Sequence, residues 1–366
     1  MKEIKGILLI LVLGIMSCGD TKKIGSGKSE LTANELQPYG RYLRTSDKGI
    51  ELISTAVHFG FTFTGNQCQV FLSVPDKNTH GYIQYELDGQ YQKRMRIEST
   101  GDQPLLLKAP NGGKHSIWIY KTTEASSGPI YIKKVMADNI KTLDVPVKPL
   151  IEFIGNSITC GAASDASEMP CDSGNYHDHH NAYYAYGPRV ARALGTNFII
   201  SSVSGIGIYR NWNSDGPTMP QVYEKAELQE DHSELWNFSN YSPNIVSIAL
   251  GTNDFSRGDG KKERLPFDSA AFVSNYINFV KLVKSKYKNA QIALLSSPMI
   301  RDKNAILFEH CLKAVKFNID EQYPRDKPVA IYLFQPMVPN GCYGHPGVED
   351  HGVMANELIP FFKKLL

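Results

Sequence analysis

Four residues in the second half of the chain have the types and the order that acyl transfer by a serine requires. They are Ser157, Gly205, Asn253 and His345. A serine hydroxyl is a weak nucleophile at neutral pH, so it needs a base within reach and donors that face the oxyanion of a tetrahedral intermediate. Histidine titrates near working pH and can accept the serine proton, then protonate the leaving alcohol. The glycine and the asparagine offer neutral N–H donors, and none of these steps needs a cofactor.

The elements that must position these residues alternate between strand and helix from Leu150 onward. The predicted strands are Leu150–Gly155, Phe198–Val203, Asn244–Leu250, Gln291–Ser296 and Val329–Phe334. The predicted helices are Ala185–Leu194, Asp268–Lys288, Ile306–Ile319 and Gly352–Leu366. This alternation predicts a parallel sheet covered by helices on both faces. Ser157, Gly205 and Asn253 each follow a strand, so they should meet at one edge of the sheet.

The first half of the chain has a different pattern, with short strands, close turns and no helical period. Strands are predicted at Ile50–Ser54, Val57–Phe63, Gln69–Val74, Tyr82–Leu87, Lys93–Glu98, Leu105–Lys108, Ser116–Lys121 and Ile130–Val135. Many short strands favour an antiparallel sandwich of the jelly-roll type over residues 37–145. Pro146–Pro149 is the predicted hinge, and the catalytic domain is expected to span 149–366.

The N-terminal 18 residues are predicted to be a targeting segment rather than part of the fold. Two lysines precede a short apolar run, which is too short to span a membrane and has the form of a secretory signal. Cys18 follows this run and Ser17, and the arrangement resembles a bacterial lipoprotein processing site. That resemblance implies lipidation of Cys18 and an exported protein of the cell envelope, facing the periplasm or on the cell surface. An ordinary signal peptide with an incidental cysteine is the alternative. Residues 19–36 are polar and are predicted to be a flexible tether.

Net charge and cysteine content indicate which partners and which disulfides the chain can have. The 366 residues carry a formal net charge of +2, so nothing indicates a nucleic-acid partner. Five cysteines remain after Cys18: Cys68, Cys160, Cys171, Cys311 and Cys342. An exported protein can form disulfides, and Cys160 and Cys171 flank a loop that they could close. Five is an odd number, so at least one thiol should stay free or pair between chains, and the sequence does not give the connectivity.

In combination, four short motifs resemble those of the SGNH (GDSL-type) hydrolases. They are GNSIT at 155–159, SGIG at 204–207, GTND at 251–254 and HP at 345–346. The two-domain layout resembles carbohydrate esterase family 2, the acetylxylan-esterase-like group, in which a jelly roll precedes the hydrolase. The resemblance implies a three-layer α/β/α catalytic domain with Ser157 as nucleophile and His345 as base. It also implies an oxyanion hole made by Ser157 N–H, Gly205 N–H and the Asn253 side chain.

The same resemblance implies a substrate class. Family members of this kind remove O-acetyl groups from plant cell-wall-type polysaccharides or oligosaccharides, with acetylated carbohydrate as partner. The sequence does not say which glycan or which hydroxyl is deacetylated, and it does not give the oligomeric state.

The chain departs from the common pattern at one position. Many SGNH enzymes have an aspartate three residues before the histidine, and here that residue is Cys342. Family 2 esterases often use a Ser–His dyad, in which a backbone carbonyl orients the histidine. The identity of a third triad member is therefore open.

Other polar and aromatic residues near the motifs allow two interpretations. Trp212 and Tyr209 are candidates for substrate binding, although packing explains a tryptophan here equally well. Asp254 is expected to be a turn or cap residue, and His351 to be structural. The run 177–180 (His-Asp-His-His) invites a metal interpretation, but adjacent side chains seldom supply the geometry of a metal site, so we expect a polar loop and no metal.

Two other functions compete with a carbohydrate esterase. One is a carbohydrate-binding protein with a dormant site, which only the missing aspartate favours. The other is a lipase or thioesterase of the same fold, which would need a long apolar groove. Loops 160–181 and 207–220 are polar and small, which favours a short acyl group and a hydrophilic alcohol.

Overall fold

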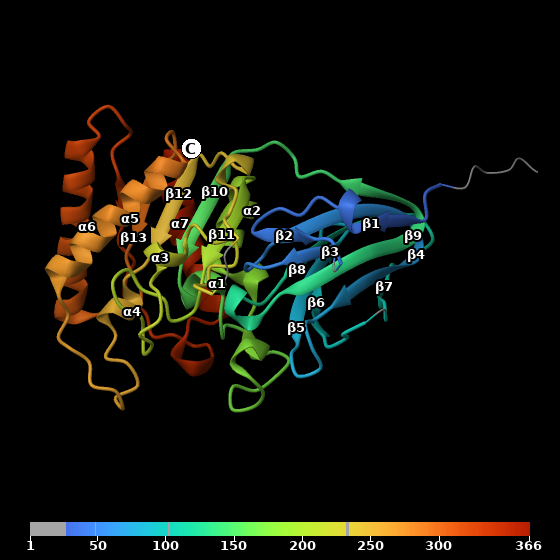
Figure 1. Cartoon of the computed structure of the whole chain (residues 1–366), viewed down its shortest axis with the longest axis horizontal. Helices are drawn as coiled ribbons and strands as arrows, with labels where there is room; N and C mark the ends of the chain where they lie inside the picture. The colour runs from blue at the N-terminus through green and yellow to red at the C-terminus, as the bar shows by residue number, and fades with distance from the viewer. Residues whose placement is uncertain (1–26, 48, 102, 232–233) are drawn as a thin grey trace, which may run out of the picture.

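The computed structural model describes residues 27–366 except 48, 102 and 232–233. The predicted signal segment and Cys18 lie outside the described residues. The chain forms an all-β domain, blue to teal in Figure 1, beside an α/β domain that runs from green to red. Residues 144–149 link the two domains, between the last strand of the first domain and the first strand of the second. No helix in the described part of the chain has both the length and the apolar character needed to cross a membrane.

The described residues of the β domain form nine strands. They are β1 (Glu30–Thr32), β2 (Tyr42–Thr45), β3 (Gly49–Leu52), β4 (His58–Ser73), β5 (Gly81–Leu87), β6 (Gln90–Ile97), β7 (Leu105–Lys108), β8 (Lys114–Lys121) and β9 (Ile130–Leu143). All strand pairs of this sheet are antiparallel, in the order β2-β3-β9-β4-β8-β5-β6, with β1 added to β9 and β7 added to β4. The predicted all-β domain is confirmed. Its strands form one continuous sheet, a half-barrel, rather than two separate sheets.

Two predictions for this domain were wrong in detail. Val57–Phe63 and Gln69–Val74 were expected as separate strands joined by a turn, but both belong to β4, which continues through Gly65 with shifts in its pairing to β9. These irregularities bend a long strand without ending it. The tether was expected to reach residue 36, but β1 pairs with β9 and Leu36 is fully buried. Apolar side chains at residues 31 and 36 therefore draw this segment onto the domain.

Apart from residues 232–233, the α/β domain is described throughout and carries five parallel strands in the order β11-β10-β12-β13-β14. The strands are β10 (Leu150–Gly155), β11 (Asn197–Ser202), β12 (Ile245–Ala249), β13 (Gln291–Leu295) and β14 (Ala330–Tyr332). The helices are α1 (Ser157–Cys160), α2 (Tyr186–Leu194), α3 (Met219–Val222), α4 (Thr252–Phe255), α5 (Ser269–Lys286), α6 (Asp302–Gln322) and α7 (Val348–Leu365). Short 3₁₀ turns η3 (Tyr176–His179), η4 (Ala182–Tyr184) and η6 (Cys342–Gly344) belong to the loops. The predicted parallel-sheet domain is confirmed.

Helices cover both faces of this sheet, and the strand sequences alternate accordingly. Ile154, Val246 and Ile248 belong to a core with α3, α5 and α6, whereas Ile151 and Phe153 belong to a core with α2 and α7. Figure 1 shows α5 and α6 together at the outer side and α2 nearer the β domain. The domain is thus a three-layer α/β/α sandwich, because each strand buries side chains in both directions.

The two domains share a buried interface. The Arg41 guanidinium of the β domain is fully buried and donates to Ser201 Oγ at 2.9 Å and to the carbonyl oxygens of Tyr223 and Lys225. Gln84 of β5 donates to Asn181 Oδ1 at 2.5 Å. Buried charge of this kind persists only when its donors are satisfied, so the docking of the domains is well defined.

Candidate active site

Ser157 lies at the junction of β10 and α1, at the carboxyl edge of the parallel sheet. Asn156 caps α1, since its side-chain oxygen accepts a hydrogen bond from Ile158 N at 3.1 Å. Gly155 has no room for a side chain, because a Cβ there would lie 2.0 Å from Thr159 Oγ1. The sharp strand-to-helix turn therefore depends on this glycine. It presents Ser157, which is 7% exposed, at the floor of a pocket.

His345 contacts Ser157 from a loop that follows β14. Its Nε2 lies 3.0 Å from Ser157 Oγ, and its Nδ1 lies 3.2 Å from the carbonyl oxygen of Tyr343. A carbonyl can only accept, so Nδ1 carries the proton and Nε2 presents its lone pair to the serine hydroxyl. Burial lowers the pKa of His345 below its usual value, which favours this neutral form.

The expected oxyanion donors line the same pocket as Ser157. Gly205 has φ of +76°, a backbone conformation that favours glycine. Asn253 lies in the first turn of α4, and its Nδ2 donates to the carbonyl oxygen of Ile206 at 2.8 Å. That bond uses one of the two amide hydrogens, leaves the other for the pocket, and fixes the orientation of the amide.

We call residues 204–211 the oxyanion loop, and a buried carboxylate holds it. Asp254 accepts backbone hydrogen bonds from Ile208 at 3.0 Å, Tyr209 at 2.9 Å and Arg210 at 3.2 Å. Burial raises the pKa of Asp254 to about 6. Asp254 thus joins the oxyanion loop to the helix that carries Asn253, which agrees with the expectation of a turn or cap role.

A second carboxylate reaches the oxyanion loop from the β domain. Glu124, which follows β8, is buried, and its Oε2 accepts from Ser204 N at 2.5 Å. Its Oε1 lies 3.3 Å from His180 Nε2, while Ala163 N donates to His180 Nδ1 at 3.2 Å, so Nε2 carries the proton. Burial by itself would raise the pKa of Glu124, but the contacts with His180 and Ser204 lower it to about 2. Glu124 is therefore a buried anion next to the oxyanion loop.

The residue at the usual aspartate position forms a disulfide. Cys342 is bonded to Cys171, 171 positions away, so the suggested link between Cys160 and Cys171 was wrong. Cys160 is a free, buried thiol 3.0 Å from Ser202 Oγ, and Cys68 and Cys311 are also free. The bond ties the residue 160–175 loop to residues 341–347, which we call the histidine loop. Hydrogen bonds from Cys342 N to Ala163 O and from Gly341 N to His345 O fix it further.

The pocket around the serine and histidine has a volume of about 520 Å³. Its lining includes Ser157, Ile158, Tyr176, Ser204, Gly205, Trp212, Thr252, Asn253, Ser256, Met299, Tyr343, Gly344 and His345. Trp212 is 44% exposed and lines both this pocket and a neighbouring one of about 540 Å³. Tyr209 is not part of the lining. Its hydroxyl accepts from Asp268 N, and its ring packs against Phe267.

Sequence reasoning missed two aromatic residues of the pocket. The hydroxyl of Tyr176 lies 3.2 Å from His345 Nε2 and 3.3 Å from Ser204 Oγ. Tyr343 is 53% exposed at the rim, and its ring meets that of Tyr176 edge to face. Tyr176 directly precedes the histidine run of η3, but no spacing rule connects it to His345.

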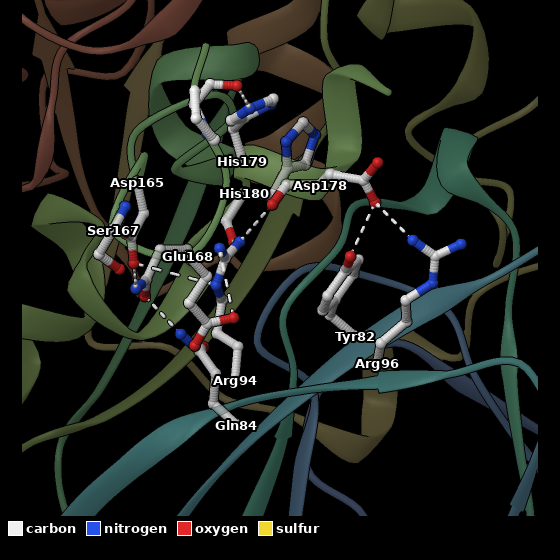
Figure 2. Close-up of polar contacts among 12 residues, drawn as sticks. Tyr82, Gln84, Arg94, Arg96, Asp165, Ser167, Glu168, Asp178, His179 and His180 are labelled. Carbon is white, nitrogen blue, oxygen red and sulfur yellow. Dashed lines mark hydrogen bonds and ion pairs between the residues drawn. The ribbon is translucent and has the colours of Figure 1, made fainter. Parts of the chain in front are cut away.

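The histidine run of η3 packs against the β domain. Arg94 donates to the carbonyl oxygens of Asp178 and His180, both at 2.7 Å. Figure 2 shows Arg94 beneath the run and the Asp178 carboxylate turned toward Tyr82. Burial lowers the pKa of His177 to about 4, so this ring is neutral at physiological pH. His351, expected to be structural, is fully buried in α7 beside Tyr186.

Each of the two domains matches a known protein family. Residues 39–146 match the carbohydrate esterase 2 N-terminal family, and residues 153–323 match the GDSL-like lipase/acylhydrolase family. An acetylxylan esterase / glucomannan deacetylase of Cellvibrio japonicus is 30% identical over 263 residues, covering 70% of this chain and 71% of that protein. A second protein of that name and organism is 24% identical over 382 residues, covering 100% of this chain and 99% of the relative.

Solved structures share the complete two-domain arrangement. A family two carbohydrate esterase from Clostridium thermocellum, in complex with cellohexaose, superposes with a TM-score of 0.77 at 25% identity, over 90% of this chain and 98% of that one. A family two carbohydrate esterase from Cellvibrio japonicus has the same fold, with a TM-score of 0.78 at 22% identity over 92% of this chain and 97% of that one. Together with the serine–histidine pair at the sheet edge, these matches show that the chain belongs to carbohydrate esterase family 2 and is a carboxylic ester hydrolase.

Proposed function

We propose that this enzyme removes O-acetyl groups from plant cell-wall-type polysaccharides or oligosaccharides by Ser–His catalysis. The observation that carries the proposal is the 3.0 Å contact between Ser157 Oγ and His345 Nε2, with Nδ1 held by a backbone carbonyl. The names of the relatives from Cellvibrio japonicus support acetylated xylan and glucomannan as the substrates to test first.

In the first half-reaction, His345 takes the proton of Ser157 as the hydroxyl oxygen attacks the acetyl carbonyl carbon. The oxyanion of the tetrahedral intermediate is stabilised by Ser157 N–H, Gly205 N–H and the free N–H of Asn253. When the intermediate collapses, the C–O bond to the sugar breaks and His345 returns the proton to the leaving sugar hydroxyl. An acetyl-serine remains.

In the second half-reaction, His345 takes a proton from water, and the water oxygen attacks the acetyl-serine. Collapse of this second intermediate breaks the bond to Ser157 Oγ, which regains its proton, and acetate leaves. The imidazolium formed in each half-reaction is supported by the Tyr343 carbonyl and, at longer range, by the negative charge of Glu124. This arrangement needs no third acidic residue next to His345.

The shape of the site supports a short acyl group on a hydrophilic alcohol. A mainly apolar pocket of about 520 Å³ lies beside Ser157 and has room for an acetyl group, and Trp212 and Tyr343 offer exposed rings on which a sugar face can stack. The neighbouring pocket, which Trp212 also lines, gives an extended glycan room to continue beyond the reacting sugar. Tyr209 has no part in this proposal, because its ring and hydroxyl are used within the domain.

Acetate release from acetylated xylan and acetylated glucomannan tests the function. We expect the parent protein, expressed as residues 19–366, to release acetate, and Ser157→Ala to lose about four to six orders of magnitude in turnover. Ser285→Ala, an exposed change on α5, is the control and should leave turnover unchanged. Undiminished release by Ser157→Ala would show that the active site lies elsewhere. No release by either protein, on any acetyl ester, would favour glycan binding without chemistry.

We also propose that the protein is an exported lipoprotein anchored in a membrane through Cys18. The apolar run before this cysteine supports the proposal. Expression of the full chain in a bacterial host with a labelled fatty acid should place label on the parent protein and none on Cys18→Ser. Equal labelling of both proteins, or none of the parent, would contradict the anchor.

A further inference from the structure

Three metal-ligating side chains from both domains converge between η3 and the β domain. His80 directly precedes β5, whereas His177 and Asp178 lie in η3. One ligand atom from each residue lies within 4.8 Å of the other two. His80 is 7% exposed and Asp178 is 2% exposed, whereas His177 is partly exposed, so the cluster lies at the edge of the domain interface.

One nitrogen in this cluster has no partner. Nε2 of His177 is buried, and it has no hydrogen-bond partner within the described part of the chain. The His177 ring is stacked near that of His80, with centroids 4.3 Å apart. A buried ring nitrogen without a partner costs free energy, and a bound ion is one of the few things that satisfies it.

The donor set matches a specific class of ion. Two imidazoles and one carboxylate, with a fourth position open to water, form a common tetrahedral environment for Zn²⁺. Asp178 is oriented by further contacts, since it accepts from Tyr82 Oη at 2.9 Å and Asn175 N at 2.6 Å. Contacts of this kind hold a ligating carboxylate in place in metal sites. Figure 2 shows the Tyr82 hydroxyl directed at this carboxylate.

Two groups compete with an ion for Asp178. His80 Nε2 lies 2.5 Å from Asp178 Oδ1, with a proton between them, and the Arg96 guanidinium lies 3.9 Å from the same oxygen. An ion between His80 and Asp178 replaces that proton, so binding releases a proton and weakens at acidic pH. Arg96 is a minor competitor, because its side chain is 41% exposed and also pairs with Glu98.

We propose that His80, His177 and Asp178 bind one divalent transition-metal ion of the zinc class, which clamps η3 to the β domain. The expectation of no metal is thereby revised, since His80 is 97 positions from His177 and only domain docking brings it near. The ion takes no part in the ester chemistry. Its effect on the site is indirect, because η3 begins with Tyr176, whose hydroxyl contacts His345 and Ser204.

The test uses the protein without a histidine tag, stripped with a chelator and then titrated with ZnCl₂ by calorimetry. We expect one ion per chain and a rise in Tm of roughly 3 °C or more when free Zn²⁺ exceeds Kd about a hundredfold. His177→Gln should fold normally, since Nε2 has no partner to lose, and should bind at least tenfold more weakly. His80→Gln should weaken binding in the same way.

His310→Gln is the matched control, because His310 is exposed on α6 far along the chain from the cluster. It should bind Zn²⁺ as the parent does. With Co²⁺ in place of Zn²⁺, the parent should show the visible absorption of a tetrahedral site, and His177→Gln should not. Absence of stoichiometric binding, or binding that His177→Gln and His80→Gln leave unchanged, would overturn the proposal.

Discussion

The oxyanion loop and the histidine loop both line the pocket of Ser157 and are fixed in different ways. The oxyanion loop is held by two buried carboxylates, Asp254 and Glu124, which accept its backbone N–H groups. The histidine loop is held by the Cys171–Cys342 disulfide and by backbone hydrogen bonds. The difference shows which part of the site depends on buried charge for its exact geometry, namely the oxyanion donors. Donors must be aimed before negative charge develops, whereas the base needs only a fixed position and a fixed tautomer.

Among the substitutions that compare the two sides of the site, the loss of an oxyanion donor should lower kcat the most. Asn253→Ala should lower kcat by about 100- to 1000-fold, because one oxyanion donor is lost while Ser157 and His345 stay in place. Steady-state kinetics on a small acetyl ester measure this loss. A change confined to KM would mean that Asn253 binds substrate and does not stabilise the transition state.

Removal of the Glu124 carboxylate, which the β domain contributes, should have the next largest effect on kcat. Glu124→Ala should lower kcat by about 10- to 100-fold with little change in KM, since a freed Ser204 N lets Gly205 move by a fraction of an ångström or more. Glu124→Gln keeps an acceptor and should recover part of the loss.

Glu86→Gln is the matched control for this experiment. Glu86 also joins the domains, by accepting from Tyr183 Oη at 2.7 Å, but it does not contact the oxyanion loop. The kcat of Glu86→Gln should match that of the parent protein. If Glu124→Ala and Glu86→Gln lost the same activity, the effect would come from domain docking in general.

The pH profile tests the histidine side of the comparison. Burial lowers the pKa of His345, and catalysis needs the neutral ring, so activity is retained to lower pH than an exposed histidine allows. We expect the acid limb of kcat/KM to have its midpoint below pH 6.5, with a tenfold fall per pH unit beneath it. A midpoint above 6.5 would mean that a nearby negative charge outweighs burial.

Loss of the disulfide should have the smallest effect on activity and a larger effect on stability. Cys171→Ala with Cys342→Ala should lower kcat only a few-fold, because backbone hydrogen bonds still hold His345, but it should lower the free energy of unfolding by about 2–4 kcal/mol. Chemical denaturation and kinetics on the same sample measure both. A loss of kcat as large as that of Glu124→Ala would show that the two loops are not fixed differently.

Much of the fold and the centre of the site followed from the sequence. Parallel strands bring their carboxyl ends to one edge, so Ser157, Gly205 and Asn253 could be placed together from the order of strands and turns alone. His345 could be assigned through its motif, and the carbonyl expected to orient it is that of Tyr343.

The features that the sequence did not reveal depend on contacts between distant segments. Glu124 and His80 reach the catalytic domain only because the two domains dock, and Cys342 finds Cys171 through the folding of two long loops. Tyr209 was misjudged for a local reason. The three backbone bonds to Asp254 set the course of the oxyanion loop, and that course turns its ring toward Phe267.

The position of Glu124 also has a consequence for protein engineering. A cut at residues 146–149 would leave Ser157, Asn253 and His345 on one fragment, yet it would remove the anion at Ser204 and expose the surface that Arg41 now fills. The β domain is therefore not an exchangeable carbohydrate-binding module. Chimeras that add further modules should keep both domains as one unit and attach the addition at the C-terminal end of α7.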